Sequence, residues 1–264
     1  MRQFRVTGKF IAYLTFQKEK HFTININKDK QLVFPLSITN NIVHDFELTL
    51  HANDLSKVEG LAKDVMDRTA GWLSFIFATP VDKIEINNIE DLTSKQQRGV
   101  LSHSISFYTA GSAPVDDQKS RLFFQKLTET LNPGDETVLG LYRKMLNTTN
   151  KAEKFWHIYN ILQILKGSPG SGSERVNIND YIQNTFPTSL GLYNDRGKND
   201  KNKKRWSILI CIRDAFSHED ARFSDKADQL DGLKLDINQE LYNHINLFQE
   251  IARKAIKDKL NLSI

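Results

Sequence analysis

Residues 210–223 read ICIRDAFSHEDARF, and this stretch decides how the C-terminal half of the chain is interpreted. It belongs to a run, Trp206–Phe216, that is apolar on nearly every side. A helix with that pattern is normally buried in a bundle. Yet Arg213 and His218 lie in and just after the run, with Asp214 beside them. Because a buried guanidinium is costly unless it is paired, we expect this segment to be either a salt-bridge network or a functional site.

Composition indicates an ordinary globular protein. The 264 residues are 39% hydrophobic and 26% charged, enough for two modest domains or one large domain with a packed core. The net charge of +4 permits a nucleic-acid partner without demonstrating one. The single cysteine, Cys211, excludes an internal disulfide and is expected in the core. With no signal-peptide pattern near the N-terminus and no membrane-length apolar run, the sequence predicts a cytoplasmic protein without membrane contact.

Hydrophobic periodicity changes along the chain. Apolar and polar residues alternate in the first half, which predicts strands at 3–16, 21–27, 31–36, 46–51, 81–87 and 99–108. A helical pattern interrupts them at Asp54–Ala78, with Asp54 as the N-cap or a rival start at Ser56.

Beyond Thr109–Val115, a small-residue segment taken as the domain boundary, helical patterns dominate. They fall at Asp116–Thr130, Asp135–Asn147, Lys151–Lys166, Tyr181–Phe186, Lys204–Phe223 and Asn238–Leu260. The predicted fold class is α+β, with a β-rich α/β domain over 1–110 and an all-α domain over 116–264.

Several common sites have no counterpart in the sequence. The glycine-rich 167–173 has no preceding strand and no following Gly-Lys-Ser/Thr, and no His-Glu-x-x-His or cysteine pair is present. We therefore expect no metal site and no cofactor. Another Arg-x4-His match, Arg98–His103, lies in a strand-like segment and is attributed to chance.

The pair Arg213 and His218 supplies the groups that phosphodiester chemistry needs, a cation on the phosphate and a proton-transfer group near neutral pKa. On an ideal helix Arg213 shares a face with Ser217, and Asp214 with His218. Asp214 could therefore orient the His218 ring.

The sequence IRDAFSH resembles the R-x(4–6)-H signature of the HEPN superfamily, in which a small polar residue follows the arginine, as Asp214 does here. The order of a motif helix and one long final helix is also similar, so the resemblance covers about 116–264. The N-terminal region resembles those of HEPN proteins similar to methylamine-utilisation protein J and to the ApeA-like group.

The resemblance implies a homodimeric, metal-independent endoribonuclease with two copies of the motif in one cleft. His218 would be the general acid or base and Arg213 would hold the scissile phosphate. Asp214 would orient His218 or bind the partner motif, and Ser217 could hydrogen-bond a phosphate. The resemblance further suggests phage defence or a toxin system, with a regulatory protein or ligand at the N-terminal domain. Other members of the superfamily are inactive scaffolds or nucleotide binders.

A basic run leads into the motif helix and could follow an RNA backbone. Its cations are Lys198, Lys201, Lys203, Lys204 and Arg205. A solvated loop explains the same charges equally well.

Two alternatives to catalysis by the pair stay open. Arg213 could be structural, paired with Asp214 or Glu153 while His218 caps the helix, in a non-catalytic nucleotide-binding, RNA-binding or partner-docking module. A metal-dependent hydrolase using His218, Asp214 and Asp220 would need further ligands from elsewhere in the chain.

Overall fold

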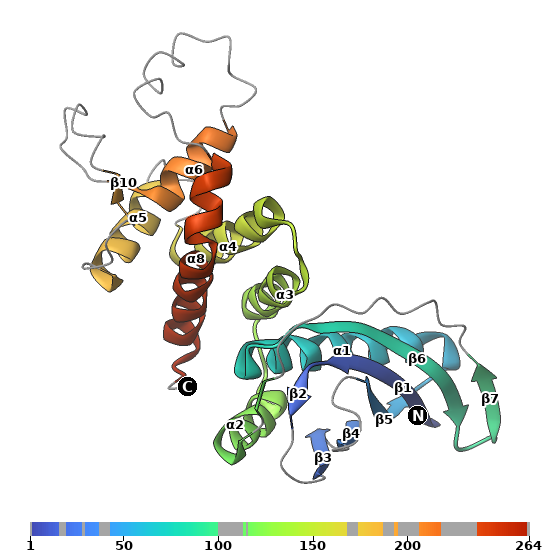
Figure 1. Cartoon of the computed structure of the whole chain (residues 1–264). Coiled ribbons are helices and arrows are strands. Elements are labelled where there is room, and N and C mark those ends of the chain that lie inside the picture. The colour runs from blue at the N-terminus through green and yellow to red at the C-terminus, as the bar shows by residue number, and fades with distance from the viewer. Residues whose placement is uncertain are drawn as a thin grey trace. The chain divides into compact units, whose positions relative to one another are not determined.

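The computed structural model describes residues 2–15, 20–27, 30–36, 43–99, 113–114, 116–167, 174–186, 193–194, 206–217 and 237–262. Contacts within the chain divide it into two compact units, Met1–Asn147 and Thr148–Ser263. The first unit combines an antiparallel sheet with helices, and the second is mostly helical, so the fold class is α+β (Figure 1).

Six strands of the first unit form one sheet in the order β3-β4-β5-β1-β6-β7, and every neighbouring pair is antiparallel. Their bounds are β1 Arg2–Ala12, β3 Lys20–Asn27, β4 Lys30–Leu36, β5 Val43–Ala52, β6 Val81–Asp91 and β7 Gln96–Gly99. The short strands β2 (Leu14–Thr15) and β8 (Ala113–Pro114) pair in parallel separately. The strands predicted at 3–16, 21–27, 31–36, 46–51 and 81–87 are therefore confirmed in substance. Most of the one predicted at 99–108 lies outside the described residues.

Alternation along β1 and β5 explains the core of this unit. Phe4 pairs with Leu50 and Val6 with Leu48, and all four side chains are buried. The intervening residues of β1, such as Arg5, are exposed. Since side chains of a strand alternate between faces, only one face of these strands is packed.

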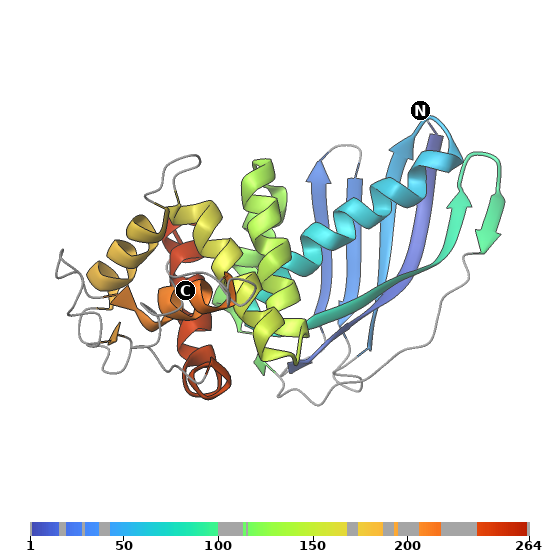
Figure 2. The same ribbon diagram turned by 90° about the horizontal axis from the view of Figure 1, so that it is seen from above.

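Helix α1 (Leu55–Phe77) covers that face, as Figures 1 and 2 show. Asp54 is its N-cap and accepts a hydrogen bond of 2.8 Å from the amide of Ser56, which decides between the two predicted starts. The helix ends at Ala78 in the left-handed conformation, with φ 52°.

Helices α2 (Asp117–Thr128) and α3 (Pro133–Asn147) pack against α1 and so belong to the first unit. Phe123 of α2 contacts Phe77, and Tyr142 of α3 meets Phe75 edge to face. The division after Asn147 corrects the boundary predicted at 109–115. That boundary marked where the sequence pattern changes from strand to helix, but the apolar faces of these two helices are buried on α1.

The second unit contains α4 (Lys151–Lys166), α5 (Glu174–Thr185), α6 (Ile208–Ser217) and α8 (Ile237–Leu260). Helix α4 packs against α5 and α8, and α6 packs against α8. The rings of Phe155, Phe216 and Phe248 meet at centroid distances of 5.6 and 6.1 Å, which joins α4, α6 and α8 in one core.

Two predicted elements of this unit differ from the structure. Helix α5 begins at Glu174, seven residues before the predicted start at Tyr181, because Ile178 and Ile182 bury a face that the polar sequence between them conceals. The helix predicted from Lys204 begins only at Ile208. Trp206 and Ser207 form strand β10, which pairs with β9 (Tyr193–Asn194). The predicted continuation over 218–223 lies outside the described residues.

Candidate functional site

The start of α6 is fixed by a buried hydrogen bond. The amide of Ser207 donates to Oδ1 of Asn179 on α5 at 2.7 Å, and both residues are fully buried. From there Ile208, Leu209, Ile210 and Ile212 turn into the core. The apolar run predicted as a buried helix is therefore buried, and its position relative to α5 is set by a side-chain amide.

Arg213 and Asp214 follow that apolar stretch and remain partly accessible. Nη1 of Arg213 donates to Oδ1 of Asp214 at 3.0 Å, and the two side chains are 29% and 21% exposed. Asp214 is thus the partner of Arg213, as one of the two predicted pairings required. Glu153, the other predicted partner, accepts a hydrogen bond of 2.7 Å from Thr148 and lies 3.6 Å from His157.

A second arginine reaches the same carboxylate. Nη1 of Arg175, in the first turn of α5, donates to Oδ2 of Asp214 at 2.9 Å. Asp214 therefore bridges two guanidinium groups, one on each oxygen. Sequence reasoning missed Arg175 because it placed only Tyr181–Phe186 of this helix, and because the pairing joins residues 39 positions apart.

Tyr159 and Glu174 form the inner side of this cluster. The guanidinium carbon of Arg213 lies 5.7 Å from the ring centroid of Tyr159, within the range of a cation–π contact. The Tyr159 hydroxyl donates to Oε1 of Glu174 at 2.8 Å, and the Gln163 amide donates to Oε2 at 3.0 Å. Four helical residues from α4 and α5 thus surround the arginine of α6.

Burial and charge shift two pKa values in the cluster. Burial, together with the hydrogen bond to Glu174, raises the pKa of Tyr159, so its hydroxyl stays protonated. Partial burial acts to lower the pKa of Arg213, but its hydrogen bond to Asp214 and the charge of Glu174 outweigh that effect and raise it. Arg213 is a permanent cation.

Cys211, one turn from this cluster on α6, is a thiol and not a reactive thiolate. Burial, with the charges of Asp214 and Glu240, raises the pKa of Cys211 to about 11. Its side chain is partly rather than fully buried, against the core position that we predicted.

The remaining predicted site residues lie mostly outside the described part of the chain. His218 and the basic residues Lys198, Lys201, Lys203, Lys204 and Arg205 are outside it, as is Asp220. Ser217 is the last residue of α6. The orientation of His218 by Asp214 therefore stays a prediction. The basic run is flanked by Asn194 and Trp206, which pair with each other between β9 and β10.

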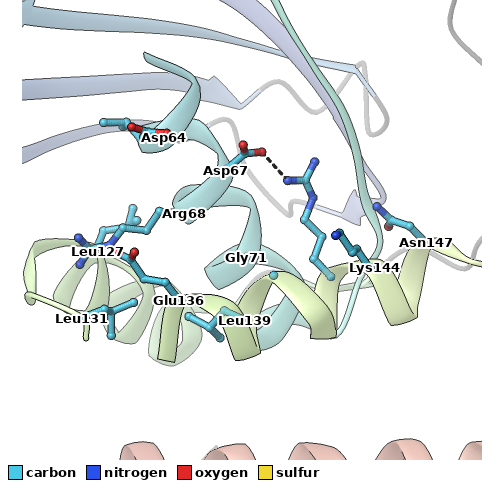
Figure 3. Close-up of a pocket in the computed structure, with 13 residues that line it drawn as sticks. Asp64, Asp67, Arg68, Gly71, Leu127, Leu131, Glu136, Leu139, Lys144 and Asn147 are labelled. Carbon is cyan, nitrogen blue, oxygen red and sulfur yellow. Dashed lines mark hydrogen bonds and ion pairs between the residues drawn. The ribbon is translucent and has the colours of Figure 1, made fainter. Parts of the chain in front are cut away.

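The first unit carries a separate cavity of about 830 Å³ between α1, the end of α2 and α3 (Figure 3). Buried Val65, Leu127 and Leu139 line it. At its rim Arg143 holds Asp67 at 2.9 Å and also donates to the carbonyl of Val81 at 2.8 Å. The charged side chains at this rim are both acidic and basic, so charge alone selects no ligand class.

Comparison with known proteins adds no further identification. No family model matches the chain, and neither a curated protein nor a solved structure matches it. Within the described ranges, no group of three or more His, Cys, Asp and Glu side chains is arranged to hold a metal ion. Of the helices described above, none has both the length and the apolar character of a membrane span.

Proposed function

We propose that the second unit is a metal-independent endoribonuclease of the HEPN type. The observation that carries this proposal is the cluster at the end of α6, where Arg213 is held by Asp214 and remains 29% exposed. A guanidinium that is both oriented and accessible suits the binding of a phosphodiester. The motif resemblance places His218 five residues further along the chain.

The reaction is an internal transfer. The 2′-oxygen of the substrate attacks the adjacent phosphorus as its P–O5′ bond breaks, which leaves a 2′,3′-cyclic phosphate and a 5′-hydroxyl. His218, as general base or acid, accepts the proton of the 2′-hydroxyl or delivers one to the departing 5′-oxygen. Arg213 donates hydrogen bonds to the phosphate oxygens, whose negative charge grows in the transition state.

The wider setting of this proposal is a homodimer that brings two motifs together in the cytoplasm, in phage defence or a toxin system. RNA is the substrate, and the first unit receives a regulatory protein or ligand. These parts rest on the family resemblance. Salt dependence tests the basic run separately, because neutralising Lys203 and Lys204 should lower the slope of binding by roughly one unit per lost phosphate contact.

A second candidate function follows from the ion pairs themselves. Asp214 and its two arginines explain a partly buried Arg213 without any reaction. On that basis the unit would be a non-catalytic module that binds nucleotide or RNA, or docks a partner.

One experiment separates the two functions. Purified full-length protein is incubated with a mixed RNA pool in EDTA, beside Arg213→Ala and His218→Ala, and the product ends are mapped. Cleavage by the unmodified chain alone, leaving 2′,3′-cyclic phosphates, is the result we expect. RNA binding without cleavage by a folded dimer would favour the binding module, and cleavage that EDTA abolishes would favour a metal-dependent hydrolase.

A further inference from the structure

The carboxylate of Asp214 separates and orients two guanidinium groups. Arg213 occupies Oδ1 at 3.0 Å and Arg175 occupies Oδ2 at 2.9 Å. Two cations this close repel each other, and a carboxylate between them offsets that repulsion. Their positions relative to one another are therefore fixed by one side chain on α6.

Arg175 is the more accessible of the two arginines. Its side chain is 45% exposed, against 29% for Arg213. A guanidinium carries five N–H donors, and the bond to Asp214 uses one of those on Arg175. The planar fork of donors that remains is the arrangement that recognises phosphate oxygens.

The second carboxylate near the arginines is Glu174. Its oxygens accept hydrogen bonds from two neutral donors, the Tyr159 hydroxyl and the Gln163 amide, at 2.8 and 3.0 Å. These bonds orient the Glu174 carboxylate toward α4. Glu174 contributes negative charge to the cluster, so selectivity for an anion must come from the directed donors of the two arginines rather than from net charge.

The same face of α5 also anchors the end of the basic run. Asn179 lies one helical turn after Arg175, and its Oδ1 accepts the amide of Ser207 at 2.7 Å. Ser207 follows Trp206, which directly follows Arg205, the last cation of the run. The described residues thus bring the chain leaving the basic run to within one turn of Arg175 on the surface of α5.

We propose that Arg175 binds the RNA phosphate next to the scissile one, while Arg213 binds the scissile phosphate and Asp214 holds the two arginines at the required spacing. This inference rests on the proposed ribonuclease function. It assigns to α5 a substrate contact that the Arg213–His218 motif does not contain.

The test measures binding without cleavage. The ligand is a short 2′-O-methyl RNA, which lacks the attacking hydroxyl, in an all-phosphodiester form and in a set of forms each carrying one neutral methylphosphonate. The proteins are the full chain, Arg175→Gln, and Lys259→Gln as a control that removes one exposed charge from α8. Dissociation constants are measured over a range of salt concentrations.

We expect Arg175→Gln to weaken binding about tenfold or more, the effect of one lost charge-assisted contact. It should also lower the salt slope by about 0.7, the value for one phosphate of a single strand. One methylphosphonate position should weaken binding to the unmodified protein and leave binding to Arg175→Gln unchanged. Kinetics on cleavable RNA should show a raised KM with kcat nearly constant.

Equal binding by Arg175→Gln and Lys259→Gln, or additive losses at every methylphosphonate position, would overturn the inference. Cleavage by the unmodified protein decides the ribonuclease function independently of this coupling. Should Arg175→Gln lower the melting temperature, the coupling is measured with Arg175→Lys, which keeps the charge beside Asp214 but loses the fork of donors. Its coupling should then fall between those of the unmodified chain and zero, and full coupling would contradict the proposal.

Discussion

Gly8 occupies a place in the central strand where no other residue fits. It pairs with Phe46 of β5 on one side and Ile86 of β6 on the other, next to a shift in the β1–β6 register. A Cβ added at this position would overlap the backbone oxygen of Glu85 and lie 2.6 Å from Cζ of Phe46. Gly8→Ala is therefore expected to strain both neighbouring strands.

The size of the effect follows from these contacts. Carbon atoms approach to roughly 3.5 Å at their best separation, so the Phe46 ring must move by about 1 Å, and the Glu85 carbonyl must move as well. Overpacking of a core costs about 1–3 kcal/mol, and disturbing a backbone hydrogen bond adds about 1 kcal/mol. We expect Gly8→Ala to lower the free energy of unfolding by about 3 kcal/mol, which is roughly 1.5 M in the urea midpoint.

Urea unfolding followed by the fluorescence of the buried Trp72 measures this, in a background of Trp156→Phe and Trp206→Phe that removes emission from the second unit. The matched control is Gly60→Ala on α1, where a Cβ would meet no atom within 4 Å. Removing a glycine from a helix interior should raise stability by about 0.5–1 kcal/mol. A Gly8→Ala midpoint equal to that of the unmodified chain would refute the clash, and a loss in Gly60→Ala as large as in Gly8→Ala would show that the comparison does not report local space.

Two further predictions concern pH. Because the pKa of Cys211 is about 11, alkylation of its thiol should be slow at pH 7 and should rise about tenfold per pH unit up to pH 10; a rate that levels off near pH 8.5 would contradict the effect of burial and of Asp214. Burial lowers the pKa of His44, whose Nε2 donates to the carbonyl of Ala12 at 3.0 Å, below its ordinary value of 6.5. The unfolded chain then binds more protons, so stability should be complete above about pH 6.5 and fall as the pH drops below it. Unfolding at pH 7.5 and 5.5 checks this, and His44→Gln should lose part of the pH dependence; an unchanged dependence would assign it to other groups.

Periodicity predicted most elements of the fold because it records which face of each element is buried. The strand alternation around Phe4 and the helical spacing of Lys151–Lys166 are both local signals, and both are confirmed. Helix α5 was predicted too short because its apolar contacts, Ile178 and Ile182, are few and its surroundings polar. The domain boundary was misplaced because a change of secondary structure need not be a change of core, and α2 and α3 complete the core built on α1.

The sequence by itself determined the class of the fold, the burial of the run before Arg213 and the pairing of that arginine with its neighbour Asp214, since these depend on spacing along one helix. The strand order and the meeting of Arg175 with Asp214 required the tertiary structure. They join residues far apart in the chain, and a surface arginine in a polar helix leaves no periodic signal of its partner. The second guanidinium of the site is thus a product of packing, which brings α5 against α6 through Asn179 and Ser207.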